Sequence, residues 1–293
     1  VWICPYPMGH IQAVGTDAAG RRQYRYHDAW RLRRDQEKFD HMLEFARSLP
    51  TLRETICSHL NQRGLSRKRV LACATRLLDL GFFRIGTEGY AEQNQTYGLA
   101  TMRKRHVCLG PNDLVTFDYR AKGGKRRVQS IVDPDVAKVV RSLKNRSTGN
   151  ELLAFKSGNR WCDVKSADIN AYVKDVTGGG FSAKDFRTWN ATVLAAVALA
   201  VSSEAALSKT ARKRAETRAI KEVAHYLGNT PAVCRASYID PRVIDRYRAG
   251  VTIGDALHRL GDDARFGQLS TQGPVEEAVL DLLDDAPTAR LAA

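Results

Sequence analysis

The sequence predicts an α+β fold: a mainly helical domain that contains a three-stranded antiparallel sheet and follows the remnant of a small β-rich domain. Three observations predict it. Short alternating segments fill the first 34 residues, apolar residues recur at helical spacing over most of the remaining chain, and three strand-like segments follow one another between 105 and 132. We therefore expect a partial β-rich domain at 1–35, a mainly helical domain at 36–250 and an acidic tail at 251–293.

Residues 1–34 are typical of short strands joined by tight turns. The segments V-W-I-C, H-I-Q-A-V and R-Q-Y-R-Y are separated by turn formers at 5–9 and 17–20. So few residues cannot bury a core of their own, and the chain starts at Val1 rather than at a methionine. We expect this segment to be the end of a small β-rich domain whose beginning is missing from the sequence.

Helical periodicity begins at Asp35, and Leu49-Pro50 predicts that this first helix stops there. A second helix is expected at about 51–61, and a third from Ser66 to about Phe83. After Pro134 the pattern is helical again, and we expect helices at about 134–145, 165–176, 184–201, 204–227 and 231–237. Beyond Gly250, the amphipathic run E-E-A-V-L-D-L-L-D-D predicts a loosely attached helix.

The three-stranded sheet is predicted between 105 and 132. The segments R-H-V-C-L, L-V-T-F-D-Y-R and R-R-V-Q-S-I-V alternate in polarity and are joined by G-P-N-D and A-K-G-G-K turns, which is the pattern of an antiparallel meander. The second turn carries Lys122, Lys125, Arg126 and Arg127. Four bases in a turn are also compatible with a simple solvated surface.

The charge distribution indicates a polyanionic partner. The chain has 46 Lys+Arg and 32 Asp+Glu, a net charge of +14; residues 251–293 hold eight acids against three bases, a net −5, which leaves +19 on residues 1–250. Basic side chains bind nucleic-acid phosphates and release condensed counterions. The first half of the 204–227 helix, K-T-A-R-K-R-A-E-T-R, is basic enough to lie along a phosphate backbone, although a generally basic protein would show the same composition.

Several classes of protein are disfavoured. No stretch approaches the roughly 18 uncharged apolar residues of a membrane span. The histidines do not cluster at metal-ligand spacing, so no metal site is expected. The cysteines are scattered without a C-x-x-C pair, and we expect reduced thiols that mostly fill the core of a cytosolic protein: Cys4, Cys57, Cys73, Cys108, Cys162 and Cys234.

The polar residues offer the groups that phosphodiester cleavage requires. The reaction needs a nucleophile, cations or amides that hold the non-bridging oxygens, and an acid for the leaving oxygen. The chain presents such residues in the order Arg84, Lys122, Arg187, Asn229 and Tyr238. Order alone leaves structural roles open, because Arg84 would also suit a helix end and Arg187 would also suit an ion pair with Asp185 or Glu204.

Four segments then resemble a known family. The runs F-F-R-I-G-T-E-G-Y, Y-R-A-K-G-G-K, A-K-D-F-R-T-W-N and L-G-N-T-P-A-V-C-R-A-S-Y-I-D-P occur in the order of the active-site motifs of type IB DNA topoisomerases, in their small bacterial and poxvirus-like branch. The resemblance covers about residues 1–248. It implies a DNA-clamping role for the N-terminal remnant and a catalytic role for the domain at 36–250.

The resemblance also implies roles for single residues. Tyr238 would be the nucleophile, Arg84 and Arg187 would bind the phosphate, and Lys122 would be the general acid. Two further positions, Tyr90 and Lys184, would contact DNA.

The chain departs from the family pattern at two positions. Asn229 stands where a histidine is common, and an amide can donate a hydrogen bond but carries no charge; His225 lies four residues earlier, and we expect it to be structural. The turn reads A-K-G-G-K instead of the usual G-K-S-G-like sequence, which leaves Lys125, otherwise a DNA contact, as a rival to Lys122. Three other tyrosines lack a preceding G-N-T-P box: Tyr97, Tyr226 and Tyr247.

We expect an enzyme that relaxes supercoiled duplex DNA by cutting and rejoining one strand through a 3′-phosphotyrosyl intermediate. The resemblance implies that it needs neither ATP nor a metal nor any other cofactor, and that it acts as a monomer on cytoplasmic, nucleoid-associated DNA. Two alternatives remain. A tyrosine recombinase or integrase shares this layout, although lysine rather than histidine at 184 argues against it, and a catalytically silent duplex-DNA-binding protein would share the fold.

Overall fold

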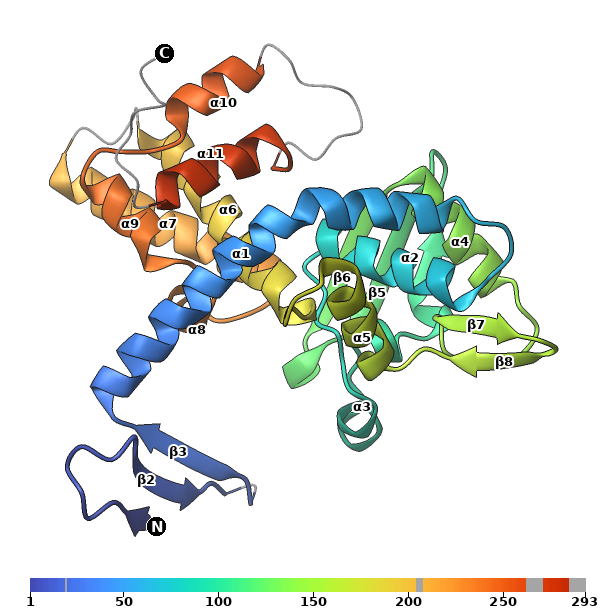
Figure 1. Cartoon of the computed structure of the whole chain (residues 1–293), viewed down its shortest axis with the longest axis horizontal. Helices are drawn as coiled ribbons and strands as arrows, with labels where there is room; N and C mark the ends of the chain where they lie inside the picture. Colours follow the sequence, from blue (N-terminus) through green and yellow to red (C-terminus); the bar gives the residue numbers. More distant parts are fainter. Residues whose placement is uncertain (19, 204–207, 262–270, 285–293) are drawn as a thin grey trace. The chain divides into compact units, whose positions relative to one another are not determined.

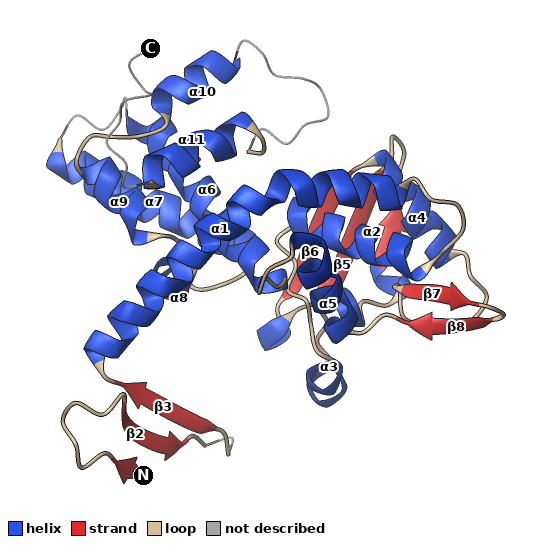
Figure 2. Ribbon diagram, in the orientation of Figure 1, coloured by secondary structure: helices blue, strands red, loops and turns tan. Residues whose placement is uncertain are grey.

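The computed structural model describes residues 1–18, 20–203, 208–261 and 271–284. The chain falls into two compact units, 1–44 and 45–293. The mainly helical α+β class is confirmed, because helices dominate the described residues and their strands form three small antiparallel sheets (Figure 2). The division into domains at 1–35, 36–250 and 251–293 concerns function rather than compactness and stays a prediction.

The first unit is a small sheet followed by the beginning of a long helix. Strands β1 (Trp2–Ile3), β2 (Ile11–Thr16) and β3 (Arg22–Tyr26) pair antiparallel in that order, as expected. Helix α1 begins at Asp28, so the expected start at Asp35 is wrong. Tyr26 stacks on Trp30 with ring centroids 4.4 Å apart, which joins the last strand to the first helical turn. The helix therefore begins earlier in the chain than expected.

Helix α1 (Asp28–Leu60) also continues through Pro50, where the sequence predicted a stop. Proline removes one helical N–H and normally costs about 3 kcal/mol in a helix interior. Packing offsets this cost, because Leu49 and Leu52 on either side of the proline are fully buried. Burial of these side chains therefore outweighs the local preference for a break.

The second unit contains the remaining elements, shown in Figure 1. Its strands are β4 (Val107–Leu109), β5 (Leu114–Arg120), β6 (Arg126–Val132), β7 (Ala154–Ser157) and β8 (Arg160–Asp163). Its helices, after the end of α1, are α2 (Arg67–Leu80), α3 (Glu88–Asn94), α4 (Pro134–Lys144), α5 (Ser166–Thr177), α6 (Ala183–Ser203), α7 (Lys209–Leu227), α8 (Pro231–Ser237), α9 (Pro241–Arg248), α10 (Gly254–Gly261) and α11 (Pro274–Leu283).

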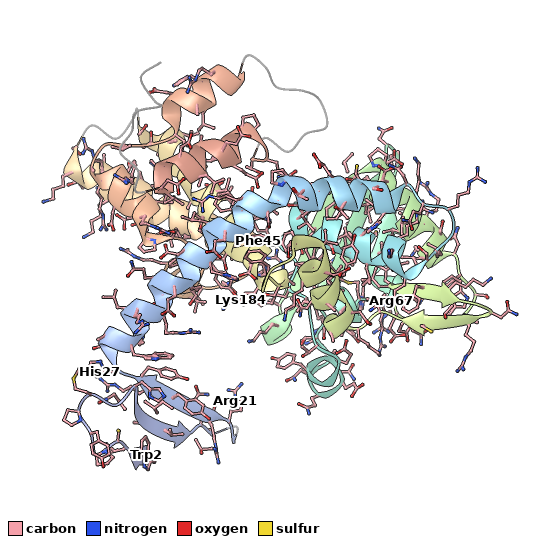
Figure 3. The ribbon with its side chains drawn as sticks, viewed as in Figure 1. Trp2, Arg21, His27, Phe45, Arg67 and Lys184 are labelled. Carbon is pink, nitrogen blue, oxygen red and sulfur yellow. The ribbon has the colours of Figure 1, made fainter. Side chains whose placement is uncertain are left out.

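The predicted meander is confirmed. Strands β4, β5 and β6 pair in sequence, and the β5–β6 register sets Tyr119 opposite Arg127. Inward side chains Val115, Phe117 and Tyr119 are buried, as their alternation predicted. The core of the unit is rich in aromatic rings: Phe45, labelled in Figure 3, meets the edge of Phe186 with centroids 4.8 Å apart.

Most helices after Pro134 lie where the sequence placed them, but several elements escaped prediction. The short helix α3, the β7–β8 hairpin, α9 and α10 were not expected, and α2 ends at Leu80 rather than near Phe83. The expected helix 204–227 appears as α7 from Lys209; residues 204–207 of that prediction lie outside the described residues.

The acidic tail is not a loosely attached helix, and that expectation is wrong for its described part. Helix α11 buries Val275, Val279 and Leu283, and it packs against α6 and α9. Its Glu276 is buried as well, with 6% of its surface exposed. Residues 262–270 and 285–293 of the tail lie outside the described residues.

The cysteines are free, as expected, but few are core residues. Cys73 and Cys234 are buried, whereas Cys57 and Cys108 are exposed. The expectation that the thiols mostly fill the core is therefore wrong.

Candidate active site

The site is built around the C-terminal end of helix α7. The helix stops because Gly228 adopts the left-handed conformation (φ 62°), which glycine reaches without strain, and Pro231 starts α8 two residues after Asn229. The last carbonyls of a helix have no intrahelical donors and carry a partial negative charge. They can therefore accept hydrogen bonds from cationic side chains.

Three arginines from different parts of the chain donate hydrogen bonds to these carbonyls. Arg127, on β6, donates to His225 at 3.2 Å and to Tyr226 at 2.6 Å. Arg187, on α6, donates to the Leu227 carbonyl at 2.9 Å. Arg84 donates to the Gly228 carbonyl at 3.2 Å and also to the side-chain oxygen of Asn229.

Arg187 is the most buried of the three, with 4% of its surface exposed. A second bond, from Nη1 to the Phe82 carbonyl, ties it to the segment that precedes Arg84. Burial first, and then the neighbouring Arg84 charge, lower the pKa of Arg187 from its ordinary 12.5 to about 10, while Tyr238 acts in the opposite direction. Its Nε is buried and has no hydrogen-bond partner among the described residues.

Tyr238 lies beside this arginine. It follows the last turn of α8, and its ring centroid is 5.4 Å from the Arg187 guanidinium carbon. The backbone is fixed on both sides, because its amide donates to the Cys234 carbonyl at 3.0 Å and its carbonyl accepts from the Thr192 hydroxyl at 3.2 Å. The residue is half-buried, so its ring lies next to a cation and the side chain keeps partial access to solvent.

Arg84 owes its position to a close approach of two glycines. A Cβ on Gly86 would lie 2.7 Å from the Gly98 Cα, and Gly86 itself has φ +74°. The Leu99 amide donates to the Arg84 carbonyl at 2.8 Å across this contact. Only glycines permit this approach, which explains the R-I-G sequence.

The predicted lysine turn is a short 3-10 segment, Lys122–Gly124, between β5 and β6. The Lys122 ammonium lies 6.0 Å from the centre of the Tyr90 ring. Lys122, Tyr90 and Arg84 line one cavity of about 250 Å³. Lys125 is exposed and does not line it.

Lys184 is also exposed, in the first turn of α6, and is labelled in Figure 3. Its backbone carbonyl accepts from the Thr188 hydroxyl at 3.3 Å, one helical turn further on. The structure therefore brings Arg84, Asn229, Arg187 and Tyr238 into one cluster, sets Lys122 and Tyr90 at its edge, and leaves Lys125 and Lys184 on the surface.

The structural roles that the sequence left open are met for Arg84 but not for Arg187. Arg84 does bond the end of a helix, because it donates to the Gly228 carbonyl. Arg187 does not pair with Asp185, whose carboxylate accepts from Ser182 instead; Glu204 lies outside the described residues. The side chain of His225 is exposed and only its carbonyl takes part in the cluster. Among the rival tyrosines, Tyr247 is 3% exposed, so it is too buried to reach a DNA backbone.

Arg127 was missed as a site residue and treated only as part of a basic turn. Burial and the neighbouring Arg84 lower its pKa, while Tyr119 acts in the opposite direction. A signal existed in the sequence: on a strand, residues two and four apart share a face, so Arg127 lies on the same side as the buried Ile131. A cation on the inner face of a strand indicates a specific partner.

Helix α7 also carries an exposed basic face, which we call the α7 stripe: Arg214, Arg218, Lys221 and His225. Spacings of four, three and four residues place these side chains above one another on one face. The opposite face is buried through Ala219, Val223 and other apolar residues. The stripe therefore runs along the helix toward the arginine cluster at its C-terminal end.

No helix in the described part of the chain is long and apolar enough to span a membrane. Within the same residues, no group of three or more His, Cys, Asp or Glu side chains is arranged to hold a metal ion.

Comparison with known proteins gives a consistent family. A family model described as "Eukaryotic DNA topoisomerase I, catalytic core" matches residues 27–253. The chain is similar to DNA topoisomerase 1B of Acanthamoeba polyphaga mimivirus, with 30% identity over 85% of this chain and 75% of the relative. It is similar to DNA topoisomerase I of monkeypox virus, with 24% identity over 79% of this chain and 71% of the relative. With DNA topoisomerase 1 beta of Arabidopsis thaliana it shares 26% identity over 54% of this chain and 16% of the relative.

Proposed function

The chain belongs to the type IB DNA topoisomerase family, and we propose that it relaxes supercoiled duplex DNA by cutting one strand, holding the cut end on Tyr238 and rejoining it. The enzyme class and the duplex substrate follow from the family. The assignment of each step to a residue of this chain is our proposal, and so are action as a monomer and a place on the nucleoid in the cytoplasm.

One observation carries the assignment. Arg187 Nε and Asn229 Nδ2 are both buried donors without a hydrogen-bond partner among the described residues. An unpaired buried donor costs about 1–3 kcal/mol, so such groups in a folded protein call for an explanation. Both donors belong to the cluster beside Tyr238. A phosphate whose non-bridging oxygens accept from them would satisfy both.

The proposed chemistry is an in-line exchange at phosphorus. The Tyr238 oxygen attacks the scissile phosphate, its proton passes to solvent, and the bond from phosphorus to the 5′ oxygen breaks. The strand end remains as a 3′-phosphotyrosyl ester, so the energy of the phosphodiester is kept and the 5′ hydroxyl can reverse the step. Rotation of the free end about the intact strand between the two steps releases supercoils.

Negative charge builds on the non-bridging oxygens as the nucleophile attacks. Arg84 and Arg187 would neutralise it, because a guanidinium is charged at neutral pH and its donors match phosphate geometry. Asn229 would add one neutral hydrogen bond from Nδ2, since its side-chain oxygen already accepts from Arg84. Docking on the α7 carbonyls holds both arginines in position before DNA binds, which lowers the reorganisation cost.

Lys122 is the proposed acid for the departing 5′ oxygen. An alkoxide is a poor leaving group, and a nearby ammonium can protonate it as the bond breaks. The cavity that Lys122 shares with Arg84 supports this choice over Lys125, which lies outside it. Tyr90, Lys184 and Lys125 are proposed to contact the DNA around the cleaved bond.

We further propose that neither ATP nor a divalent metal is needed, because the ester exchange conserves bond energy and the cations are supplied by side chains. The test is relaxation of a supercoiled plasmid in EDTA without ATP. Activity is expected for the wild type, and Tyr238→Phe should form no covalent adduct on a nicked suicide substrate. Tyr247→Phe is the matched control and should still form it. An adduct on Tyr238→Phe, or relaxation that stops in EDTA, would refute the assignment.

A further inference from the structure

The carboxylate of Glu276, on α11, is the centre of a buried hydrogen-bonded network. It accepts from Arg53 at 2.5 and 2.9 Å and from the indole N–H of Trp189 at 2.8 Å, while the Gly273 amide donates to it at 3.0 Å. Glu276 is 6% exposed and Trp189 is fully buried. This residue lies beyond the part of the chain that the family model matches, 27–253.

The network continues from Arg53 to the segment that carries Arg84. Arg53 also donates to the Asp79 carboxylate at 2.9 and 3.0 Å. Asp79 lies in the last turn of α2, five residues before Arg84, and is 2% exposed. Burial alone would lower the pKa of Arg53, but its hydrogen bonds to Glu276 and Asp79 outweigh that effect and raise it. The guanidinium is therefore a permanent bridge between two carboxylates.

A second branch leads to the helix that carries Arg187. Trp189 is two residues after Arg187 on α6, so the indole bond to Glu276 fixes the first turns of that helix. The two branches meet again, because Asn190 donates to the Asp79 carbonyl at 3.1 Å and Arg187 donates to the Phe82 carbonyl. Segment 79–84 and helix α6 are thus joined to each other and to Glu276.

The C-terminal segment also approaches the site directly. Thr271 and Gln272, just before α11, line a cavity of about 280 Å³ together with Phe82 and Tyr226. The carbonyls of Phe82 and Tyr226 hold Arg187 and Arg127. The described tail therefore reaches the backbone on which the catalytic cluster is docked.

We propose that Glu276 is a positioning residue for the proposed cleavage reaction, and that α11 acts through it to hold Arg84 and Arg187 in register with the scissile phosphate. This inference rests on the proposed function. A group displaced by about 1 Å can lose about 100-fold in rate, so a carboxylate that fixes two phosphate-binding elements at once has a large effect without touching DNA.

The test compares Glu276→Gln with the wild type in single-turnover cleavage of a suicide duplex. The amide keeps the size and an acceptor for Trp189 but removes one of the two negative charges that hold Arg53. We expect cleavage to be about 10- to 100-fold slower, with DNA affinity changed less than about twofold. A methylphosphonate at the scissile position lacks one charged oxygen, so less negative charge builds up for the arginines to stabilise. On this substrate the defect should shrink to about threefold or less.

Two further variants separate positioning from a general loss of stability. Val140→Ala removes part of a buried side chain on α4, which contributes no residue to the network, and at a temperature where all variants are folded it should cleave like the wild type. Trp189→Phe removes the indole donor together with some buried volume. Glu276→Gln keeps the acceptor for Trp189, so each change weakens a different branch, and the double variant should be slowed by about the product of the two single effects.

The outcomes are distinct. A wild-type chain that forms no phosphotyrosyl adduct would refute the proposed function and the inference with it. If the wild type cleaves and Glu276→Gln cleaves equally fast, only the inference fails. An equal slowing of Glu276→Gln on phosphate and methylphosphonate substrates would also overturn it, since a purely structural defect affects both alike.

Discussion

Replacing Arg187 by lysine should change the pH dependence of DNA cleavage, and the environment of the side chain sets the size of the change. Burial and the neighbouring Arg84 lower the pKa of Arg187 from 12.5 to about 10. Below that pH the guanidinium is charged and able to stabilise the phosphate; above it the charge is lost. The wild type should therefore cleave at full rate through neutral pH and lose activity only toward about pH 10.

A lysine at 187 starts from an ordinary pKa of about 10.4. The same environment would lower it to about 8, so its charge would be lost within the usual assay range. The compact ammonium also lacks the planar arrangement of donors of the guanidinium. In Arg187 the two Nη atoms donate to the Phe82 and Leu227 carbonyls, and Nε has no partner among the described residues. We expect cleavage at pH 6.5 to be about 100- to 1,000-fold slower than wild type, in line with the loss of one oxyanion donor.

The assay is single-turnover formation of the covalent adduct between pH 6 and 10.5. For Arg187→Lys the rate should fall about tenfold per pH unit above about pH 8, whereas the wild-type profile stays flat to near pH 10. Thermal denaturation at each pH verifies that both proteins are folded. Parallel pH profiles for the two proteins would show that the charge at position 187 does not act on the transition state, and the reasoning from burial would be refuted.

Three other predictions follow from the same site. Lys122→Ala should slow cleavage about 10²- to 10⁴-fold and regain speed on a substrate with sulfur at the 5′ bridging position, because a thiolate needs no acid to leave; Lys125→Ala should lose less than about tenfold, and the reverse ranking would transfer the acid role. Gly228→Ala should lower the free energy of unfolding by about 1 kcal/mol or more, since its φ is +62° and a Cβ would lie 2.6 Å from Arg127 Nη1, which chemical denaturation can measure. Replacing both arginines of the α7 stripe by glutamine should reduce the slope of log affinity against log salt by about 1.8 if the stripe contacts two phosphates, and an unchanged slope would exclude those contacts.

Local patterns in the sequence were sufficient where the local preference and the tertiary packing agree. The meander was predicted because β5 alternates buried and half-buried residues, and α4 because Asp133 and Pro134 form a regular helix start. The prediction failed at Pro50 because buried leucines on both sides outweigh the missing hydrogen bond. It failed for α11 because amphipathicity shows that a helix has an apolar face but not what covers that face.

The site divides in the same way. Motifs and resemblance indicated Arg84, Lys122, Arg187, Asn229 and Tyr238, and the fold brings four of these five side chains into one cluster. The Arg53–Glu276 bridge joins residues 223 positions apart, and no local pattern encodes such a partner. A weaker signal was present: Glu276 falls on the same helical face as the buried Val279 and Leu283, where a carboxylate requires a buried cation.

The three arginines that bond the C-terminal carbonyls of α7 concentrate positive charge at one point of the fold. Together they bring three positive charges to a helix end whose dipole supplies roughly half a negative charge. No acidic side chain within the described ranges forms a salt bridge with Arg84, Arg127 or Arg187, in contrast to Arg53, which holds two carboxylates.

Burial, and then repulsion from Arg84, disfavour the charged arginines in the folded state and lower the pKa of Arg187 and Arg127. Carboxylates at this position would relieve the repulsion, but they would also compete with the phosphate for the same donors. Backbone carbonyls are weaker acceptors than carboxylates, so they can orient the guanidiniums without neutralising them. The end of α7 therefore keeps the arginines in place and their charge available, and binding of a phosphodiester should stabilise the protein most in this region.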